Sequence, residues 1–109
     1  MISSDVIRGY NDTIILSLLL ENDSYGYEIS KNIRLITNDL YIIKETTLYS
    51  AFNRLEKNGY IVSYAGNETF GKKRTYYKIT PEGKEYYEAK CEEWKITKDV
   101  INKFIKEMN

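Results

Sequence analysis

The apolar residues of the first segment recur at helical spacing. Intervals of three and four residues give one continuous apolar face, which predicts a largely buried helix, and its members are Ile7, Ile14, Ile15, Leu18 and Leu19. The pattern stops at residues 21–24, where Glu, Asn, Asp and Ser form a cluster that favours a turn. We therefore expect a first helix that ends before this cluster.

A second helix is predicted from Ser24, whose hydroxyl can accept a backbone N–H as an N-cap, to about Thr37. One face of this helix is marked by Tyr25, Ile29, Ile33 and Ile36. Gly26 is a poor helix former, so we expect it to let another backbone come close.

A third helix is predicted after an irregular stretch near Asn38 and Asp39. Its apolar face consists of Leu48, Ala51, Phe52 and Leu55. Gly59 suits the left-handed conformation that follows many helices, so we expect this helix to close at Asn58 and Gly59.

The period then changes from that of helices to that of strands. Residues 60–64 and 75–79 are rich in β-branched and aromatic side chains, and they flank a turn-prone segment from Ala65 to Arg74. This pattern predicts a β-hairpin with a long tip. The tip carries three consecutive cations, Lys72, Lys73 and Arg74.

A fourth helix is predicted to begin at Thr80 and Pro81, which supply a cap and a proline at the first helical position. We expect it to run almost to Met108. Its apolar seam alternates between four- and three-residue spacing and is interrupted by Lys98, and its members are Tyr87, Cys91, Trp94, Ile101, Ile105 and Met108. One small chain leaves much of this seam uncovered, so we expect a homodimer with Cys91, Trp94, Ile101, Ile105 and Met108 in its interface.

Three helices, a hairpin with a basic tip and a further helix follow the order of a winged helix-turn-helix. We therefore expect a mainly α fold with a small β-hairpin. Residues 1–80 would form the winged helix-turn-helix DNA-binding domain. Residues 81–109 would form a long C-terminal dimerisation helix within the same continuous compact domain.

The charge of the chain is unevenly distributed. It has 16 basic and 16 acidic side chains, and a net charge of zero argues against a nucleic-acid partner. However, residues 1–43 contain three basic and six acidic side chains, whereas residues 44–78 contain seven basic and three acidic ones. The middle third is therefore locally cationic, as contact with phosphate requires.

The third helix of a winged helix enters the major groove, and the wing touches the DNA backbone. With its apolar face inward, helical geometry places Thr46, Ser50, Asn53 and Lys57 outward and Thr47, Tyr49 and Arg54 at the flanks. Such side chains suit base edges and phosphates, although an ordinary solvated face has the same composition. The cations of the hairpin tip shift the balance towards DNA.

Composition excludes several other functions. The chain has no histidine and one cysteine, which excludes an intrachain disulfide, a Cys/His metal site and a histidine-dependent triad. A glycine-rich phosphate loop is also missing, so we expect no enzyme, no cofactor and no metal. The apolar stretch from Thr13 to Leu20 is far shorter than the roughly 20 residues of a membrane span, and no signal segment opens the chain, so we expect a cytoplasmic protein.

Three stretches resemble the defining motifs of the PadR family of transcriptional regulators. They are Gly26 to Ile29, Thr47 to Tyr49 followed by Arg54 to Gly59, and Arg74 to Gly83. The resemblance extends over nearly the whole chain, including Arg8, Gly9 and Trp94, and looks closest to short members that sense drugs. It implies a dimer built by the first and fourth helices, a repressor role and release from DNA by a small aromatic effector.

The resemblance also bears on single residues. It places the hydroxyl of Tyr49 near the DNA backbone. Lys44 departs from the pattern, because relatives often carry a small capping residue there, and it could instead add a phosphate contact. In similar drug-sensing members a tryptophan lines a flat cavity between protomers. Trp94 either does so here, with Lys98 one turn beyond it disfavouring cationic ligands, or simply packs in a dimer core.

One alternative function stays open beside DNA binding, and an enzyme has the least support. A winged helix that binds another protein is favoured by the zero net charge, and apolar contacts would give it little salt dependence. For a two-fold dimer on DNA, we expect a pseudo-palindromic operator with half-sites about 10 bp apart. We expect Cys91 to be a small buried residue and not a redox sensor.

Overall fold

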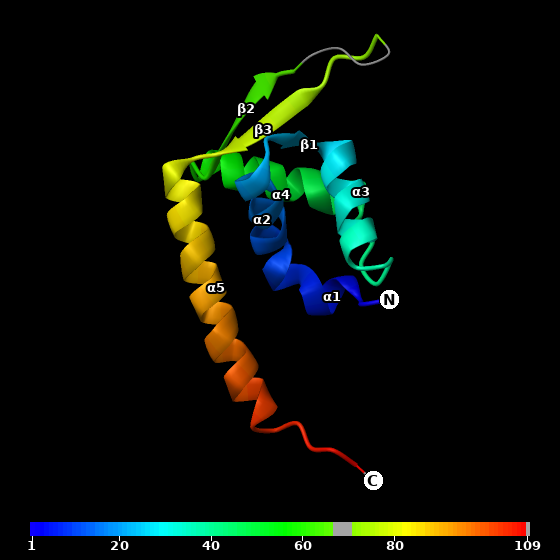
Figure 1. Cartoon of the computed structure of the whole chain (residues 1–109), viewed down its shortest axis with the longest axis vertical. Helices are drawn as coiled ribbons and strands as arrows, with labels where there is room; N and C mark the ends of the chain where they lie inside the picture. The colour runs from blue at the N-terminus through cyan, green and yellow to red at the C-terminus, as the bar shows by residue number, and fades with distance from the viewer. Residues whose placement is uncertain (67–70, 109) are drawn as a thin grey trace.

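The computed structural model describes residues 1–66 and 71–108. Figure 1 shows a helical body with a small sheet along one side and a long C-terminal helix that extends past the body. In chain order the elements are α1 (Ser4–Ile7), the 3-10 turn η1 (Arg8–Tyr10), α2 (Asn11–Glu21), β1 (Ser24–Tyr25), α3 (Gly26–Ile36), α4 (Glu45–Lys57), β2 (Ile61–Ala65), β3 (Thr75–Ile79) and α5 (Pro81–Asn102). The predicted mainly α fold with a small β-hairpin is confirmed.

The predicted first helix is broken into α1, η1 and α2. Gly9 lies in the tight turn between the two α-helices, where its low helix propensity weakens a continuous helix. After the turn, α2 buries Ile15, Leu16 and Leu19. The break leaves α1 and η1 on the outside of the body, next to the start of α2.

The core lies where α2, α3 and α4 meet the sheet. The largest fully buried side chains come from all of these elements, and they are Ile15, Leu16, Ile29, Ile33, Phe52, Leu55 and Ile61. The ring of Phe52 stacks on Tyr77 of β3, with the two centroids 4.0 Å apart. One face of α4 is thereby fixed against the sheet.

The sheet is antiparallel, with strand order β1-β3-β2. In the predicted hairpin, β2 and β3 pair from Ile61 with Ile79 to Ala65 with Thr75. The third strand, β1, was not predicted, because a two-residue strand is too short to show alternation. It pairs Ser24 with Tyr77 and attaches the start of α3 to the wing.

Two predictions for α3 are wrong. Ser24 does not cap this helix, since it belongs to β1 and its hydroxyl donates to Glu28 Oε1 at 2.5 Å, while Tyr25 takes the N-cap position. Ile36, expected on the buried face, is 69% exposed. The helix ends at Ile36, and Asn38 and Asp39 then turn the chain with positive φ angles.

The connection from α3 to α4 is anchored by Tyr41. Its backbone N–H donates to Thr37 Oγ1 at 3.1 Å, and its hydroxyl donates to Asn11 Oδ1 at the start of α2. Both Tyr41 and Asn11 are buried, and burial raises the pKa of the Tyr41 hydroxyl. This link between the start of α2 and the connection positions the first turn of α4.

The predicted start of α5 is confirmed, but its predicted end is wrong. Thr80 Oγ1 accepts the N–H of Gly83 at 3.0 Å and donates to the carbonyl of Gly59 at 2.7 Å. The helix ends at Asn102, well short of Met108. Ile105 and Met108 follow it and are 68% and 94% exposed, so burial does not offset the conformational entropy that a longer helix would lose. Among the described residues, no helix is both long enough and apolar enough to span a membrane.

A substitution at Gly83 tests how closely α5 packs on the hairpin. A Cβ at this position would lie 2.1 Å from the carbonyl oxygen of Tyr60 and 2.8 Å from Cγ1 of Ile79. Because the nearer neighbour is backbone, we expect Gly83→Ala to lower the free energy of unfolding by about 1–3 kcal/mol. Urea unfolding followed by circular dichroism measures this change.

The matched control is Gly9→Ala. Among the described residues, no atom outside its own turn lies within 4 Å of a Cβ at Gly9, so we expect a change within about 0.5 kcal/mol. Equal stability of the Gly83→Ala variant and the wild type would contradict this packing.

Candidate nucleic-acid interface

One face of α4 is exposed along the helix. Thr46, Ser50, Asn53 and Lys57 are exposed, opposite the buried Leu48, Ala51, Phe52 and Leu55. The predicted phase of this helix is therefore confirmed. Lys44 takes the N-cap position, where its ammonium cannot accept a hydrogen bond from the first backbone N–H groups. The start of α4 consequently has no side-chain cap and carries an exposed cation.

Tyr49 lies on the flank of α4 that faces α3 and the wing. Its ring packs edge-on against Phe52, with centroids 5.5 Å apart, and the side chain remains 44% exposed. A Cβ at Gly26 would lie 2.5 Å from the Tyr49 hydroxyl oxygen. The close approach expected at Gly26 is thus made by a side chain and not by backbone. The absence of a Cβ at Gly26 lets α3 hold Tyr49 in this position.

Three tyrosine rings lie side by side across the outer face of the sheet. Tyr76 of β3 stacks on Tyr64 of β2 at a centroid distance of 5.8 Å and packs at a tilt of 51° against Tyr25 of β1 at 5.3 Å. Arg74 extends this row, because its guanidinium carbon lies 4.3 Å from the centroid of the Tyr25 ring. Its Nε is buried and has no hydrogen-bond partner in the part of the chain that the structure describes.

The three predicted wing cations are therefore not equivalent. Arg74 lies along the sheet, whereas Lys72 and Lys73 are exposed. A hollow of about 250 Å³ between the wing and α4 is bordered by Lys73, Arg74, Tyr27 and Tyr49. Residues 67–70 of the predicted tip lie outside the described residues.

The opposite flank of α4 carries Thr47 and Arg54. Arg54 Nε donates to Asp12 Oδ2 at 3.2 Å, and Arg54 Nη2 donates to Asp12 Oδ1. The hydrogen bond with Asp12 raises the pKa of Arg54. The sequence predicts Arg54 as a DNA contact but does not reveal its pairing with Asp12, because 42 residues separate the two and no local pattern links them.

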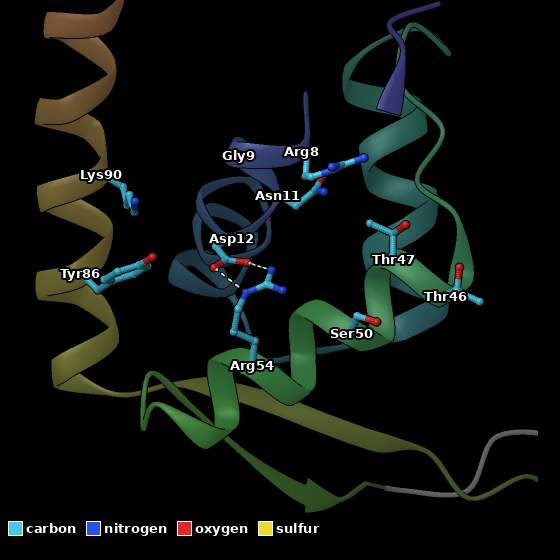
Figure 2. A pocket seen from close by; sticks show the side chains of 10 residues that line it. All are labelled: Arg8, Gly9, Asn11, Asp12, Thr46, Thr47, Ser50, Arg54, Tyr86 and Lys90. Carbon is cyan, nitrogen blue, oxygen red and sulfur yellow. Dashed lines mark hydrogen bonds and ion pairs between the residues drawn. The ribbon is translucent and has the colours of Figure 1, made fainter. Parts of the chain in front are cut away.

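Asp12 and Arg54 lie in a cleft of about 420 Å³ between α4, the start of α2 and α5, which we call the α4–α5 cleft. Figure 2 shows Tyr86 and Lys90 projecting from α5 towards this ion pair. The remaining walls are Arg8, Gly9 and Asn11 on one side and Thr46, Thr47 and Ser50 of α4 on the other. Some of the predicted DNA contacts thus adjoin Tyr86 and Lys90, which the sequence did not single out.

A second depression, of about 460 Å³, is mostly apolar and is lined by other residues of α1, η1, α2 and α5. We call it the α1–α5 groove. Trp94 is 45% exposed there and packs edge-on against Tyr10 at 5.3 Å, and Cys91 contributes to the same wall. Lys98 lies one turn further along α5 and is not part of the lining.

Within residues 1–66 and 71–108, no group of His, Cys, Asp or Glu side chains could hold a metal ion.

The close contact between Gly26 and Tyr49 can be tested by substitution. Gly26→Ala would push the Tyr49 hydroxyl away, and we expect a loss of about 1 kcal/mol in the free energy of unfolding. In a Tyr49→Ala background the nearest remaining neighbour is Phe52 at 3.7 Å, an ordinary contact, so the loss should disappear. A double-mutant cycle by urea unfolding measures this coupling. Equal cost in both backgrounds would show that another contact limits Gly26.

Comparison with known proteins identifies similar chains. Residues 15–89 match the transcriptional regulator PadR-like family. A solved transcriptional regulator from Clostridium thermocellum is 75% identical, with a TM-score of 0.90 over 97% of this chain and 100% of that one. A solved PadR family transcription regulator from Clostridium difficile is 41% identical, with a TM-score of 0.73 over 87% of this chain and 97% of that one. An uncharacterised protein of Lysinibacillus sphaericus is 50% identical over 96% of both chains.

The matched residues include most of α2, all of α3, α4 and the hairpin elements, and the first part of α5. These elements build the exposed face of α4, both of its flanks and the wing. The chain therefore belongs to the PadR-like family of transcriptional regulators, and it regulates transcription and is not an enzyme.

Proposed function

We propose that the protein is a homodimeric repressor that binds a pseudo-palindromic operator and is released by a small planar aromatic molecule. The observation that carries the DNA-binding part of this proposal is the exposed polar face of α4, held outward by its buried opposite face and flanked by the wing lysines. The proposed DNA contacts are Lys44, Thr46, Thr47, Tyr49, Ser50, Asn53, Arg54, Lys57, Lys72, Lys73 and Arg74. In this scheme residues 1–80 bind DNA and residues 81–109 dimerise.

The proposed dimer is supported by apolar surface on α5 and the N-terminal segment. Val6, Trp94 and Ile101 are 64%, 45% and 52% exposed, and such surface on a small chain favours burial against a second copy. The seam from Cys91 to Ile101 lies on α5, whereas Ile105 and Met108 would have to join the interface from the segment after the helix. Two-fold symmetry would then place two α4 helices in successive major grooves, about 10 bp apart.

The proposed effector site is the α1–α5 groove. Its apolar lining and the exposed ring of Trp94 suit a planar aromatic molecule, which could stack on that ring. Lys98 one turn away carries a positive charge, so a neutral or anionic molecule would bind better than a cationic one. The alternative role of Trp94 is packing in the core of the dimer.

A second candidate function is a winged helix that binds another protein. It is favoured by the zero net charge and by the Asp12 carboxylate, which offsets the charge of Arg54 beside α4. The salt dependence of binding separates the two functions, because DNA binding releases counterions and apolar protein contacts do not.

The wing lysines test the proposed DNA binding. We expect the Lys72→Ala/Lys73→Ala variant to bind specific and unrelated duplexes more weakly by the same factor, because phosphate contacts carry no sequence information. The slope of log K against log salt should fall by about 0.9 for each phosphate that the variant no longer neutralises. Fluorescence anisotropy at several salt concentrations measures both quantities. The control is Lys84→Ala/Lys106→Ala, which removes the same charge from exposed positions on and after α5, and an equal weakening there would refute a specific wing contact.

The exposed face of α4 predicts a different effect for Asn53. Asparagine can form two hydrogen bonds with adenine. The Asn53→Ala variant should therefore lose about 1–3 kcal/mol of discrimination between bases at one base pair of the operator. The affinity of the variant for unrelated DNA should equal that of the wild type. Binding to an operator selected from random sequence, and to its single-base variants, measures this loss. Asn22→Ala, at the exposed end of α2, is the control. Unchanged base preference after Asn53→Ala would show that this side chain does not read a base.

A further inference from the structure

The α4–α5 cleft lies beside the helix that is proposed to enter DNA. An α-helix with its side chains is about 10–12 Å wide, and the major groove is about 12 Å wide. A helix seated in the groove therefore has a sugar–phosphate strand along each of its two flanks. On α4 one flank carries Tyr49 and faces the wing, while the other carries Thr47 and Arg54 and opens into the cleft.

The cleft offers cations and hydroxyls from three separate elements. Arg8 comes from η1, Arg54 from α4 and Lys90 from α5, and Thr47 and Ser50 add hydroxyl groups. Such groups are those that proteins use to contact DNA phosphates. Figure 2 shows Lys90 and Arg54 projecting into the same space from facing elements. Arg8 and Lys90 both lie outside α3, α4 and the wing strands.

Each of these cations has an acidic neighbour. Arg54 uses Nε and Nη2 to bind Asp12, which leaves Nη1 for a further acceptor. Arg8 pairs with Asp5 at 2.7 Å, and both side chains are largely exposed. Lys90 Nζ lies 3.5 Å from Glu93 Oε1, in a pair whose lysine side chain is 28% exposed and whose glutamate side chain is 68% exposed. Because both acidic partners are largely exposed, water screens these pairs and makes them weak, so a phosphate can replace Asp5 or Glu93 as the partner.

We propose that the α4–α5 cleft holds the DNA strand on the side of α4 opposite the wing, with Arg8 and Lys90 as phosphate contacts. This inference rests on the proposed DNA binding by α4. It makes α5 part of the DNA interface, in addition to its proposed role in dimerisation. Arg54, oriented by Asp12, contributes its outer N–H groups to the same strand.

The test uses the full-length protein and two duplexes, an operator selected from random sequence and an unrelated duplex of equal length. Arg8→Ala and Lys90→Ala should each weaken binding to both duplexes by the same factor. Each should also lower the slope of log K against log salt by about 0.9, the value expected when one phosphate is no longer neutralised. The controls are Arg34→Ala, an arginine in a similarly exposed pair with Asp39, and Lys84→Ala, an exposed lysine of α5 outside the cleft. Both should match the wild type.

A second measurement places the contact on one strand. Neutral methylphosphonate linkages, introduced one at a time, should weaken wild-type binding at two groups of positions, one on each wall of the groove. Arg8→Ala and Lys90→Ala should lose sensitivity to one group only, and Lys73→Ala to the other group.

The outcomes separate this inference from the function on which it rests. If wild-type protein binds neither duplex in a salt-dependent manner, DNA binding by α4 fails. If the wild type binds steeply with salt and both cleft variants match it, only the cleft proposal is overturned. Equal weakening in the Arg34→Ala and Lys84→Ala controls would also overturn it, because this would reveal a general charge effect. Circular dichroism melting curves exclude loss of fold as the cause.

Discussion

Phe52 packs flat against Tyr77, and this contact between α4 and β3 determines how the rest of the interface is arranged. Leu48 and Leu55 are buried one turn on either side of Phe52, so α4 has no freedom to rotate about its axis. A helix turns once in 3.6 residues, and fixing its buried face therefore fixes the direction of every other side chain. The polar face and both flanks of α4 follow from this core packing.

The two flanks of α4 share one physical feature, which is a polar side chain held in place by a neighbour. Gly26 leaves the space in which Tyr49 lies, and Asp12 binds two nitrogens of Arg54. The Asp12–Arg54 pair is half-exposed on the arginine side, so its contribution to stability is only about 0–1 kcal/mol. Its larger effect is to restrict the rotamers of Arg54, which reduces the entropy that this side chain loses when it binds a further group.

The sequence predicted the parts of the fold that depend on local patterns. The buried positions of α4 and the cap at Thr80 follow from spacing and residue type, and the structure confirms them. The Asp12–Arg54 pair and the position of Arg74 over Tyr25 depend on contacts between distant segments, and no periodicity reveals those. The predicted end of α5 was wrong for a related reason. Spacing placed Ile105 and Met108 on the helix, but in the single chain these side chains bury little surface.

The α4–α5 cleft and the α1–α5 groove share their structural supports. Arg8 and Tyr10 belong to the same 3-10 turn, and Lys90 and Cys91 are adjacent on α5, with one member of each pair lining each depression. A ligand that enters the groove and separates Tyr10 from Trp94 would move η1 relative to α5. The same movement would change the distance between the cations that line the cleft. Coupling between two binding sites is reciprocal. A DNA strand held in the cleft would therefore oppose this movement, and it would weaken binding of the ligand by the same factor by which the ligand weakens binding of DNA.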